Sequence, residues 1–249
     1  MTYEYNSTKP FDLSSETIIM LGRADDKNKR FYLGIQAMEY IIKEKLECEM
    51  KIISYINKNT NFLMDLSNNI NLKNNIKFVG FTSQPEKFFK NASLHIMPST
   101  SESFSLAVGE TKIYGIPTII LGLNYLSISN FGTIILYDDT AENIAKEALK
   151  ILNNEKYRKR LGKQAKQSMK KFNNKLLLKK WIKLILCIYS GDIYYQQMKN
   201  MDKKLNKKHY LNILNKQLYL IKKKKPFYNN INVNNLLNFS FLVNINLKQ

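Results

Sequence analysis

The sequence predicts an α/β fold built on a doubly wound parallel sheet, followed by a basic C-terminal extension that is mostly helical. Six short β-branched runs are apolar on both faces, which is typical of strands buried in a parallel sheet. Helical stretches with short connections separate these runs, and this alternation predicts βαβ units. The expected strands are Thr17–Leu21, Met50–Tyr55, Ile76–Val79, Leu94–Met97, Thr118–Leu121 and Thr133–Leu136.

The helices between the strands carry their own signals. Apolar residues recur at spacings of three or four from Phe31 to Ile42 and predict one amphipathic face. Ser83–Glu86 is a capping box that opens a short helix at 85–90, and Asp139–Glu142 is a similar start signal. Further helices are expected at 106–114, 140–152, 155–171 and 175–189.

The composition is that of a folded protein without a disulfide framework. The chain has 249 residues, 44% of them hydrophobic, which suits one large domain or two small ones and excludes wholesale disorder. Two cysteines, Cys48 and Cys187, cannot build a disulfide scaffold, so a reducing compartment is expected. The sequence has no signal-peptide pattern and no run of roughly 18 apolar residues that could span a membrane. We therefore expect a cytoplasmic protein.

The positive charge is concentrated in the last part of the chain. The formal net charge is +19, yet residues 1–150 carry 16 basic and 17 acidic residues, whereas residues 151–249 carry 23 and 3. This asymmetry favours an anionic partner, either nucleic acid or acidic lipid, with a peripheral position on the inner face of a membrane as one possibility. An AT-rich coding sequence would give the same Lys- and Asn-rich composition without any partner. Charge carried almost wholly by Lys argues against sequence-specific nucleic-acid recognition.

Changes in composition along the chain suggest three segments. Residues 1–15 resemble a linker, residues 16–190 form the α/β domain, and residues 191–249 form a Lys- and Asn-rich extension that is helical or partly disordered. His95 lies within an apolar strand and is expected to be a core residue rather than a catalytic one. The spacing of the cysteines and histidines suggests no metal site.

The loop after the first strand has the features of an anion site. Gly22–Arg30 lies at the carboxyl edge of the sheet, where doubly wound folds bind ligands. Gly22 allows the backbone to approach a ligand closely, and the following helix start adds N–H donors. Arg23 and Arg30 are two of only four arginines in the chain, and a guanidinium group can bind phosphate through two hydrogen bonds. An ordinary solvated turn is the alternative interpretation.

The loop after the fourth strand, Pro98–Ser105, leads into the helix at 106–114. Its serines predict free backbone N–H groups and hydroxyl caps at the helix start. Glu102 lies in the loop and Glu110 lies two turns inside the helix, about 12 Å further along. A catalytic carboxylate pair acting on one bond needs a separation of ~5–9 Å, so these two could only contact opposite ends of an elongated ligand. A helix cap with an exposed glutamate is the alternative.

These residues resemble a known family. Glu102 and Glu110, followed by Gly115–Thr118, resemble the signature of the C-terminal, nucleotide-sugar-binding domain of retaining GT-B glycosyltransferases, the "glycosyl transferases group 1" family. Gly22-Arg23 with Lys29 resembles the diphosphate clamp of that family. Further similar segments follow in the same order, namely Ile76–Phe81, Ala92–Ser99 and Asn154–Gly162. The resemblance covers about residues 17–189 and implies a Rossmann-like fold, one half of a GT-B enzyme.

The resemblance also implies roles for individual residues. Arg23 and Lys29 would neutralise the donor diphosphate as it leaves, and Glu102 would contact the transferred sugar, so these three are the expected catalytic residues. Glu110 would accept the ribose hydroxyl groups. The expected donor-binding set is Gly22, Ser103, Phe104, Ser105, Leu106 and Glu110, with the backbone N–H groups of 103–106 on the phosphates or the sugar. No metal or cofactor is implied, and the substrate would be a UDP- or GDP-sugar.

The sequence departs from the family pattern in three places. Ser54–Thr60 replaces the glycine-rich turn after the second strand, so the contacts to the base are left undefined. The spacing from Arg23 to Lys29 is one residue longer than the commonest pattern, so Lys27 or Arg30 could replace Lys29. The acceptor-binding N-terminal domain of the family is missing from the sequence. We therefore expect half of a hexosyltransferase, incomplete alone, that works with a separate N-terminal half.

A different class of function competes with this expectation. The chain could be an inactive nucleotide-sugar-binding relic or an adaptor, and its basic extension at 191–249 would then dock it on an anionic membrane or on nucleic acid.

Overall fold

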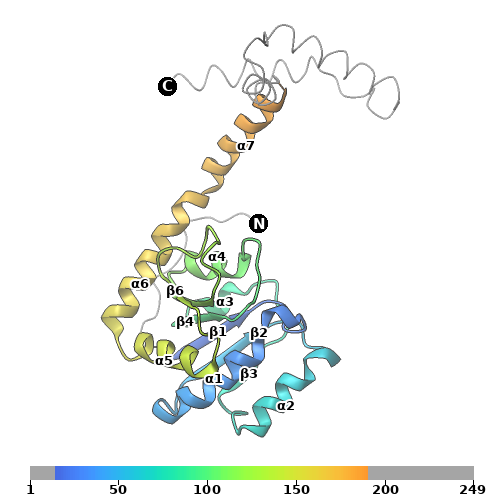
Figure 1. The fold of residues 1–249 in the computed structure, drawn as a ribbon, viewed down its shortest axis with the longest axis vertical. Helices are drawn as coiled ribbons and strands as arrows, with labels where there is room; N and C mark the ends of the chain where they lie inside the picture. The colour runs from blue at the N-terminus through green and yellow to red at the C-terminus, as the bar shows by residue number, and fades with distance from the viewer. Residues whose placement is uncertain (1–14, 190–249) are drawn as a thin grey trace. The chain divides into compact units, whose positions relative to one another are not determined.

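The computed structural model describes residues 15–189 and contains one parallel sheet of six strands (Figure 1). The strand order is β3-β2-β1-β4-β5-β6, and every neighbouring pair is parallel. This is the order of a doubly wound sheet, in which β1 and β4 flank the point where the chain reverses direction across the sheet. The strands are β1 Thr17–Leu21, β2 Glu49–Ile53, β3 Ile76–Phe78, β4 Leu94–Met97, β5 Thr118–Leu121 and β6 Thr133–Leu136.

All six predicted strands are confirmed, and four of them have the predicted bounds. Strand β2 is displaced toward its N-terminus, because Glu49 pairs with Thr17 at one end of the ladder. At the other end, Ser54 leaves the ladder and its hydroxyl oxygen accepts a hydrogen bond from the Ala24 N–H (2.8 Å). The ordered turn after β2 is therefore tied to the loop after β1.

The helices follow the predicted pattern with one addition. Helix α2 was not predicted, because it is short and a third of its residues are Asn, which has a low helix propensity. The predicted helix at 155–171 is an α-helix that ends in a 3₁₀ turn, Met169–Phe172. The helices are α1 Phe31–Glu44, α2 Asn61–Asn69, α3 Glu86–Phe89, α4 Leu106–Ile113, α5 Ala141–Leu152, α6 Glu155–Ser168 and α7 Asn174–Tyr189, with 3₁₀ turns at Lys27–Lys29 and Lys58–Thr60.

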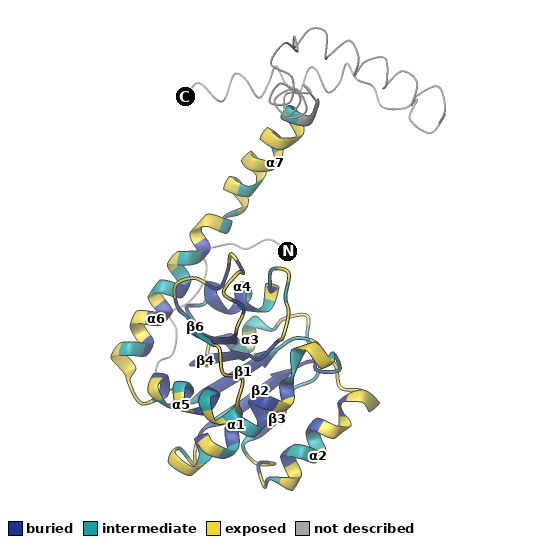
Figure 2. Cartoon of the chain, viewed as in Figure 1, coloured by how far each residue is buried: buried dark blue, intermediate teal, exposed yellow. Residues whose placement is uncertain are grey.

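Both faces of the sheet are buried (Figure 2). Along β1 the side chains alternate, so that Ile18 and Met20 pack on one face while Ile19 packs on the other. The first face carries the largest core, with the apolar sides of α1 and α5. Residues of α3 and α4 belong to two smaller clusters with side chains from β1, β2, β4 and β5. This two-sided burial explains why the strands read as continuous apolar runs.

Helix α6 packs very closely against the turn before β6. Gly132 has φ +74°, and a Cβ added there would lie 2.4 Å from the backbone nitrogen of Ala165. Gly162 on the same helix similarly faces the carbonyl oxygen of Gly115 at 2.3 Å from an added Cβ. Only glycine fits at these contacts.

The chain divides into two compact units between Asn174 and Lys175. No helix within residues 15–189 is long and apolar enough to cross a membrane. Residues 1–14 of the predicted linker at 1–15, and the whole predicted extension at 191–249, lie outside the described residues.

Candidate functional site

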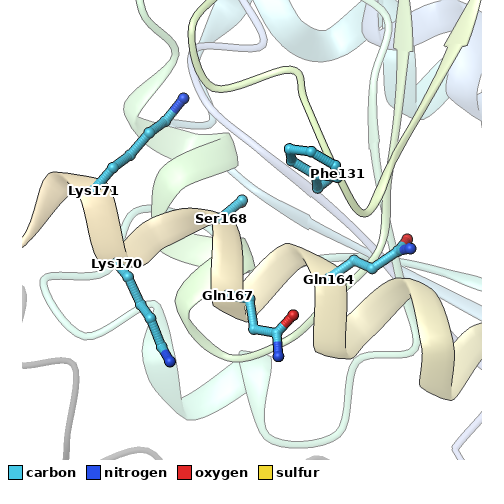
Figure 3. A pocket seen from close by; sticks show the side chains of 6 residues that line it. All are labelled: Phe131, Gln164, Gln167, Ser168, Lys170 and Lys171. Atoms are coloured by element: carbon cyan, nitrogen blue, oxygen red, sulfur yellow. The ribbon is translucent and has the colours of Figure 1, made fainter.

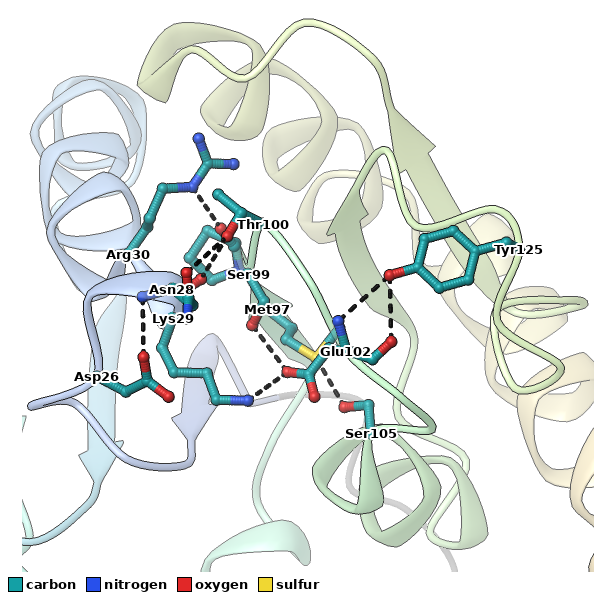
Figure 4. Close-up of polar contacts among 11 residues, drawn as sticks. Asp26, Asn28, Lys29, Arg30, Met97, Ser99, Thr100, Glu102, Ser105 and Tyr125 are labelled. Carbon is teal, nitrogen blue, oxygen red and sulfur yellow. Dashed lines mark hydrogen bonds and ion pairs between the residues drawn. The ribbon is translucent and has the colours of Figure 1, made fainter.

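The two predicted ligand loops meet at the carboxyl edge of the sheet, because β1 and β4 are neighbours (Figure 4). The Thr100 N–H donates to the Asn28 carbonyl oxygen (2.8 Å), and Arg30 Nε donates to the Pro98 carbonyl oxygen (2.9 Å). Doubly wound sheets bind their ligands at this reversal of strand order. The structure therefore joins into one site the loops that the sequence singled out separately.

Glu102 and Lys29, two of the predicted catalytic residues, form an ion pair at this site. Lys29 Nζ lies 2.5 Å from Glu102 Oε1, and the Ser99 hydroxyl donates to the same oxygen (2.9 Å). The side chains are only 23% and 11% exposed, which makes the pair stronger than an ordinary surface salt bridge. The Lys29 ammonium group and the Glu102 carboxylate thus lie in direct contact.

Tyr125, which the sequence analysis missed, holds the main chain of Glu102. The Glu102 N–H donates to the tyrosine hydroxyl oxygen (3.3 Å), and the hydroxyl donates to the Glu102 carbonyl oxygen (3.1 Å). Tyr125 comes from the loop between β5 and β6, 23 residues away in the chain. No local motif marks it, so only the tertiary structure could reveal it.

Arg30 serves as a tie between loops. It has φ 45°, an uncommon conformation for a side chain other than glycine, at the start of α1. Its guanidinium group reaches Asp139 after β6 (2.5 Å) in addition to the Pro98 carbonyl, and this contact lowers the pKa of the Asp139 carboxyl group through a hydrogen bond and charge attraction. Arg30 is therefore engaged by other partners and Lys27 is exposed, so Lys29 is the cation that contacts Glu102.

Arg23, the third predicted catalytic residue, lies at a cavity of about 320 Å³ beside the ion pair's loop. Its side chain is 71% exposed and lies 3.6 Å from Asp25. Gly22, with φ +146°, also lines the cavity, and Glu110 of α4 lies on its wall. The full lining is Leu21, Gly22, Arg23, Ile53, Ser54, Tyr55, Phe81, Thr82, Ser83, Pro85 and Glu110.

The cavity has one acidic wall and one aromatic wall. Partial burial and the nearby Glu86 carboxylate raise the pKa of Glu110 above its ordinary value. The rings of Tyr55 and Phe81 stack face to face, with centroids 4.4 Å apart, and both remain exposed to solvent. Exposed aromatic faces that line a cavity can stack on a planar ligand. Neither aromatic residue was predicted as a site residue.

The start of α4 differs in detail from the expectation. Ser105 has φ 65° and its hydroxyl donates to the sulfur of Met97 (2.8 Å), so no side chain caps the helix. The predicted hydroxyl cap is therefore wrong, because the left-handed backbone directs this side chain toward β4. Phe104 is an anchor that packs edge-to-face on Phe172 (5.1 Å), whereas Ser103 and Leu106 are exposed at the loop surface.

The remaining candidates are structural or lie elsewhere. His95 is fully buried, burial lowers its pKa to about 3, and its Nδ1 lies 3.1 Å from the Thr111 hydroxyl. Cys48 is a buried free thiol. In the described part of the chain, no cluster of His, Cys, Asp or Glu side chains could hold a metal ion.

A second cavity, of about 380 Å³, lies beside α6 and has no acidic residue in its lining (Figure 3).

The sequence was compared with known protein families and with curated proteins. Residues 4–168 match the family described as "Glycosyl transferases group 1". Over 113 residues the chain is 29% identical to an uncharacterized glycosyltransferase of Methanocaldococcus jannaschii, and the alignment covers 42% of this chain and 32% of the relative.

Several solved structures share the fold. S. aureus TarM, solved with fondaparinux, alpha-GlcNAc-glycerol and UDP, superposes with a TM-score of 0.66 at 20% identity, over 74% of this chain and 38% of TarM. The sucrose-phosphate synthase of Thermosynechococcus elongatus gives 0.65 at 17% identity, over 76% and 52%. Anabaena HepE in complex with UDP and glucose gives 0.64 at 13% identity, over 74% and 55%.

The chain spans about a third of the curated relative and 38% to 55% of these solved proteins. Its six-stranded sheet corresponds to one Rossmann-like half of a GT-B fold. The family match covers well over half of the chain and includes both ligand loops. The chain therefore belongs to the glycosyl transferases group 1 family.

Proposed function

We propose that this chain is the donor-binding half of a retaining glycosyltransferase of the hexosyltransferase type, and that it binds a nucleoside-diphosphate sugar at the carboxyl edge of the sheet. The observation that carries the proposal is the convergence of Arg23 and Glu110 on one cavity. The Lys29–Glu102 pair lies on the loops that follow β1 and β4, at the same edge of the sheet. TarM was solved with UDP, and HepE with UDP and glucose, which supports a nucleotide-sugar donor for this fold.

The nucleoside would occupy the cavity of about 320 Å³, a volume at the lower end of ordinary ligand pockets. Its base would stack on the exposed Tyr55–Phe81 pair, and its ribose hydroxyl groups would donate to the Glu110 carboxylate. Acidic residues are suited to this contact, because a carboxylate accepts both hydroxyl hydrogens of a ribose diol.

The diphosphate would lie between the two tied loops. Arg23 supplies a cation free to turn toward the phosphates, because its side chain is mostly exposed. Lys29 would exchange part of its contact with Glu102 for a phosphate oxygen, and the uncapped first turn of α4 adds N–H donors. These charges would stabilise the leaving diphosphate as the glycosidic bond breaks. Glu102 would then face the transferred sugar with its carboxylate.

The test is nucleotide binding by the full chain, measured by calorimetry and by thermal shift with UDP, GDP, UDP-glucose and GDP-mannose. Loss of a charge-assisted hydrogen bond costs about 1.5–3 kcal/mol, so Arg23→Ala should weaken binding roughly 10- to 100-fold. Glu110→Gln and Tyr55→Ala should also weaken nucleotide binding. Lys159→Ala removes a cation from α6 that is paired with Glu155, away from the cavity lining, and should leave binding unchanged.

No response to any of these nucleotides would refute the donor site. An equal loss of nucleotide affinity in Lys159→Ala and Arg23→Ala would show that the binding comes from general charge attraction and not from this site.

We also propose that sugar transfer needs an acceptor-binding half, because the chain spans only 38% to 55% of the solved proteins that share its fold. The chain alone should bind donor without transferring sugar to an added glycan or lipid-linked acceptor. Release of UDP or GDP by the chain alone, dependent on such an acceptor, would contradict this.

A further inference from the structure

Lys112 is a fully buried lysine that the donor site does not use. It lies on α4 two residues after Glu110, and its side chain is 0% exposed. Its Nζ donates to the carbonyl oxygens of Ile128 and Asn130, both at 2.5 Å. Among the ion pairs of residues 15–189, none includes Lys112, so no carboxylate balances its charge.

Such a position is costly for the fold. Burial of an ammonium group without a counter-charge costs several kcal/mol, whereas a methionine of similar length would fill the same space without that cost. Burial, together with repulsion from Lys171, lowers the pKa of Lys112 to about 7. Stability alone therefore does not explain why a lysine occupies this position. We look for the explanation in the two carbonyl groups that its ammonium group binds.

The two carbonyl groups belong to the loop of residues 122–132 between β5 and β6, named here the β5–β6 loop. Lys171 Nζ donates to the Ser127 carbonyl oxygen of the same loop (2.6 Å), and the Ser129 hydroxyl donates to the Leu126 carbonyl (2.7 Å). Figure 3 shows Phe131 of this loop and Lys171 at the second cavity. Two lysines from different elements thus hold the loop by its backbone.

The β5–β6 loop carries Tyr125, whose hydroxyl holds both the N–H and the carbonyl of Glu102 (Figure 4). The ring of Tyr125 is 63% exposed, so burial does not fix its position and the loop backbone must do so. Glu102 is then held on two sides. Lys29 and Ser99 bind its carboxylate, and Tyr125 binds its main chain.

We propose that Lys112 is a positioning residue, which acts through the β5–β6 loop and Tyr125 to orient Glu102 toward the sugar of the donor. This inference rests on the proposed function. Lys112 also couples the two parts of the donor site, because the helix that bears Glu110 is locked to the loop that sets Glu102.

The test separates binding of the sugar from binding of the nucleotide. For the full chain, the dissociation constants of UDP and UDP-glucose, and of GDP and GDP-mannose, are measured by calorimetry. Their ratio reports the contribution of the sugar. Lys112→Met and Tyr125→Phe should each reduce this contribution about 3- to 10-fold and leave UDP or GDP affinity unchanged. This loss corresponds to one hydrogen bond between a misplaced Glu102 and the sugar. Combining the two substitutions should give little further loss, because both act on one path.

Tyr137→Phe is the matched control, because Tyr137 is a strongly exposed tyrosine after β6 with no contact to Glu102 among the hydrogen bonds described. It should change neither constant. An unchanged ratio in both Lys112→Met and Tyr125→Phe would overturn the inference. A loss of affinity that is equal for the nucleotide and for the nucleotide sugar would also overturn it, since this indicates a merely structural role.

Tyr125→Phe removes one hydroxyl from an exposed ring and keeps the inference testable if Lys112→Met does not fold. In that event, an unaltered ratio in Tyr125→Phe refutes the proposal by itself. If the unmodified chain binds no nucleotide sugar, the proposed function fails instead, and the two failures are distinguishable.

Discussion

Replacing Lys112 with methionine should change how the stability of the protein depends on pH. Burial lowers the pKa of Lys112 from 10.5 to about 7. Below pH 7 both the folded and the unfolded chain carry the proton, so the folded state bears the full cost of a buried charge. Between pH 7 and 10.5 the unfolded chain still binds a proton that the folded chain has lost. Stability therefore rises with pH in this window.

The magnitude follows from the pKa shift. One pH unit in this window changes the free energy of unfolding by at most about 1.4 kcal/mol, and the change from pH 7 to pH 9 amounts to about 2 kcal/mol. Lys112→Met has no titrating group at this position and lacks this rise. The variant should be more stable than the unmodified protein at pH 6, and its advantage should shrink by about 2 kcal/mol between pH 7 and pH 9.

Urea unfolding at pH 6, 7, 8 and 9, at constant ionic strength, measures this difference. Far-ultraviolet circular dichroism is the suitable signal, because the single tryptophan, Trp181, lies on α7 and not in the sheet unit. The buried Cys48 thiol, whose pKa is raised to about 12, acts in the opposite direction above pH 9 but is common to both proteins. Parallel stability curves for the two proteins would refute the argument.

Three further predictions concern the packing, the site and the core. Gly132→Ala should lower the free energy of unfolding by about 2–4 kcal/mol, because the added methyl group meets the backbone of α6. Gly80→Ala is the control, since Gly80 has a similar φ but open space around it. An equal loss for both variants in urea unfolding would argue against the clash. A double-mutant cycle of Lys29→Met and Glu102→Gln should show a coupling of about 1–2 kcal/mol by thermal unfolding, and additive effects would contradict a functioning ion pair. His95, whose pKa is about 3, stays neutral in the folded protein, while the same side chain in the unfolded chain gains a proton below pH 6.5. The free energy of unfolding should therefore fall by about 2 kcal/mol from pH 6.5 to pH 5 relative to His95→Gln. An identical pH dependence of the two proteins would disprove this prediction.

The sheet could be predicted from the sequence because its strands are buried on both faces. Most strands are then predominantly apolar runs that can be recognised without knowing their neighbours. Helix α2 escaped prediction because Asn-rich helices have weak local signals and depend on tertiary packing, here through Leu63 and Ser67. The bounds of β2 also depended on pairing with β1, which lies 32 residues away.

The candidate site was only partly predictable. Gly22, Arg23, Glu102 and Glu110 stood in recognisable local motifs, and the structure places each of them at the carboxyl edge of the sheet. Lys112 follows Glu110 and Thr111 on α4 and had no signal of function, since a lysine in a helix is usually solvated.

The sequence by itself determined the elements, their order along the chain and the two loops with chemistry, because these follow from local patterns of apolar, glycine and charged residues. Only the tertiary structure decided that β1 lies beside β4, and thus that Lys29 meets Glu102. It alone brought Tyr125 to the main chain of Glu102 and Lys112 to the β5–β6 loop. These contacts join residues far apart in sequence, and their formation depends on strand order and close packing, which no local pattern encodes.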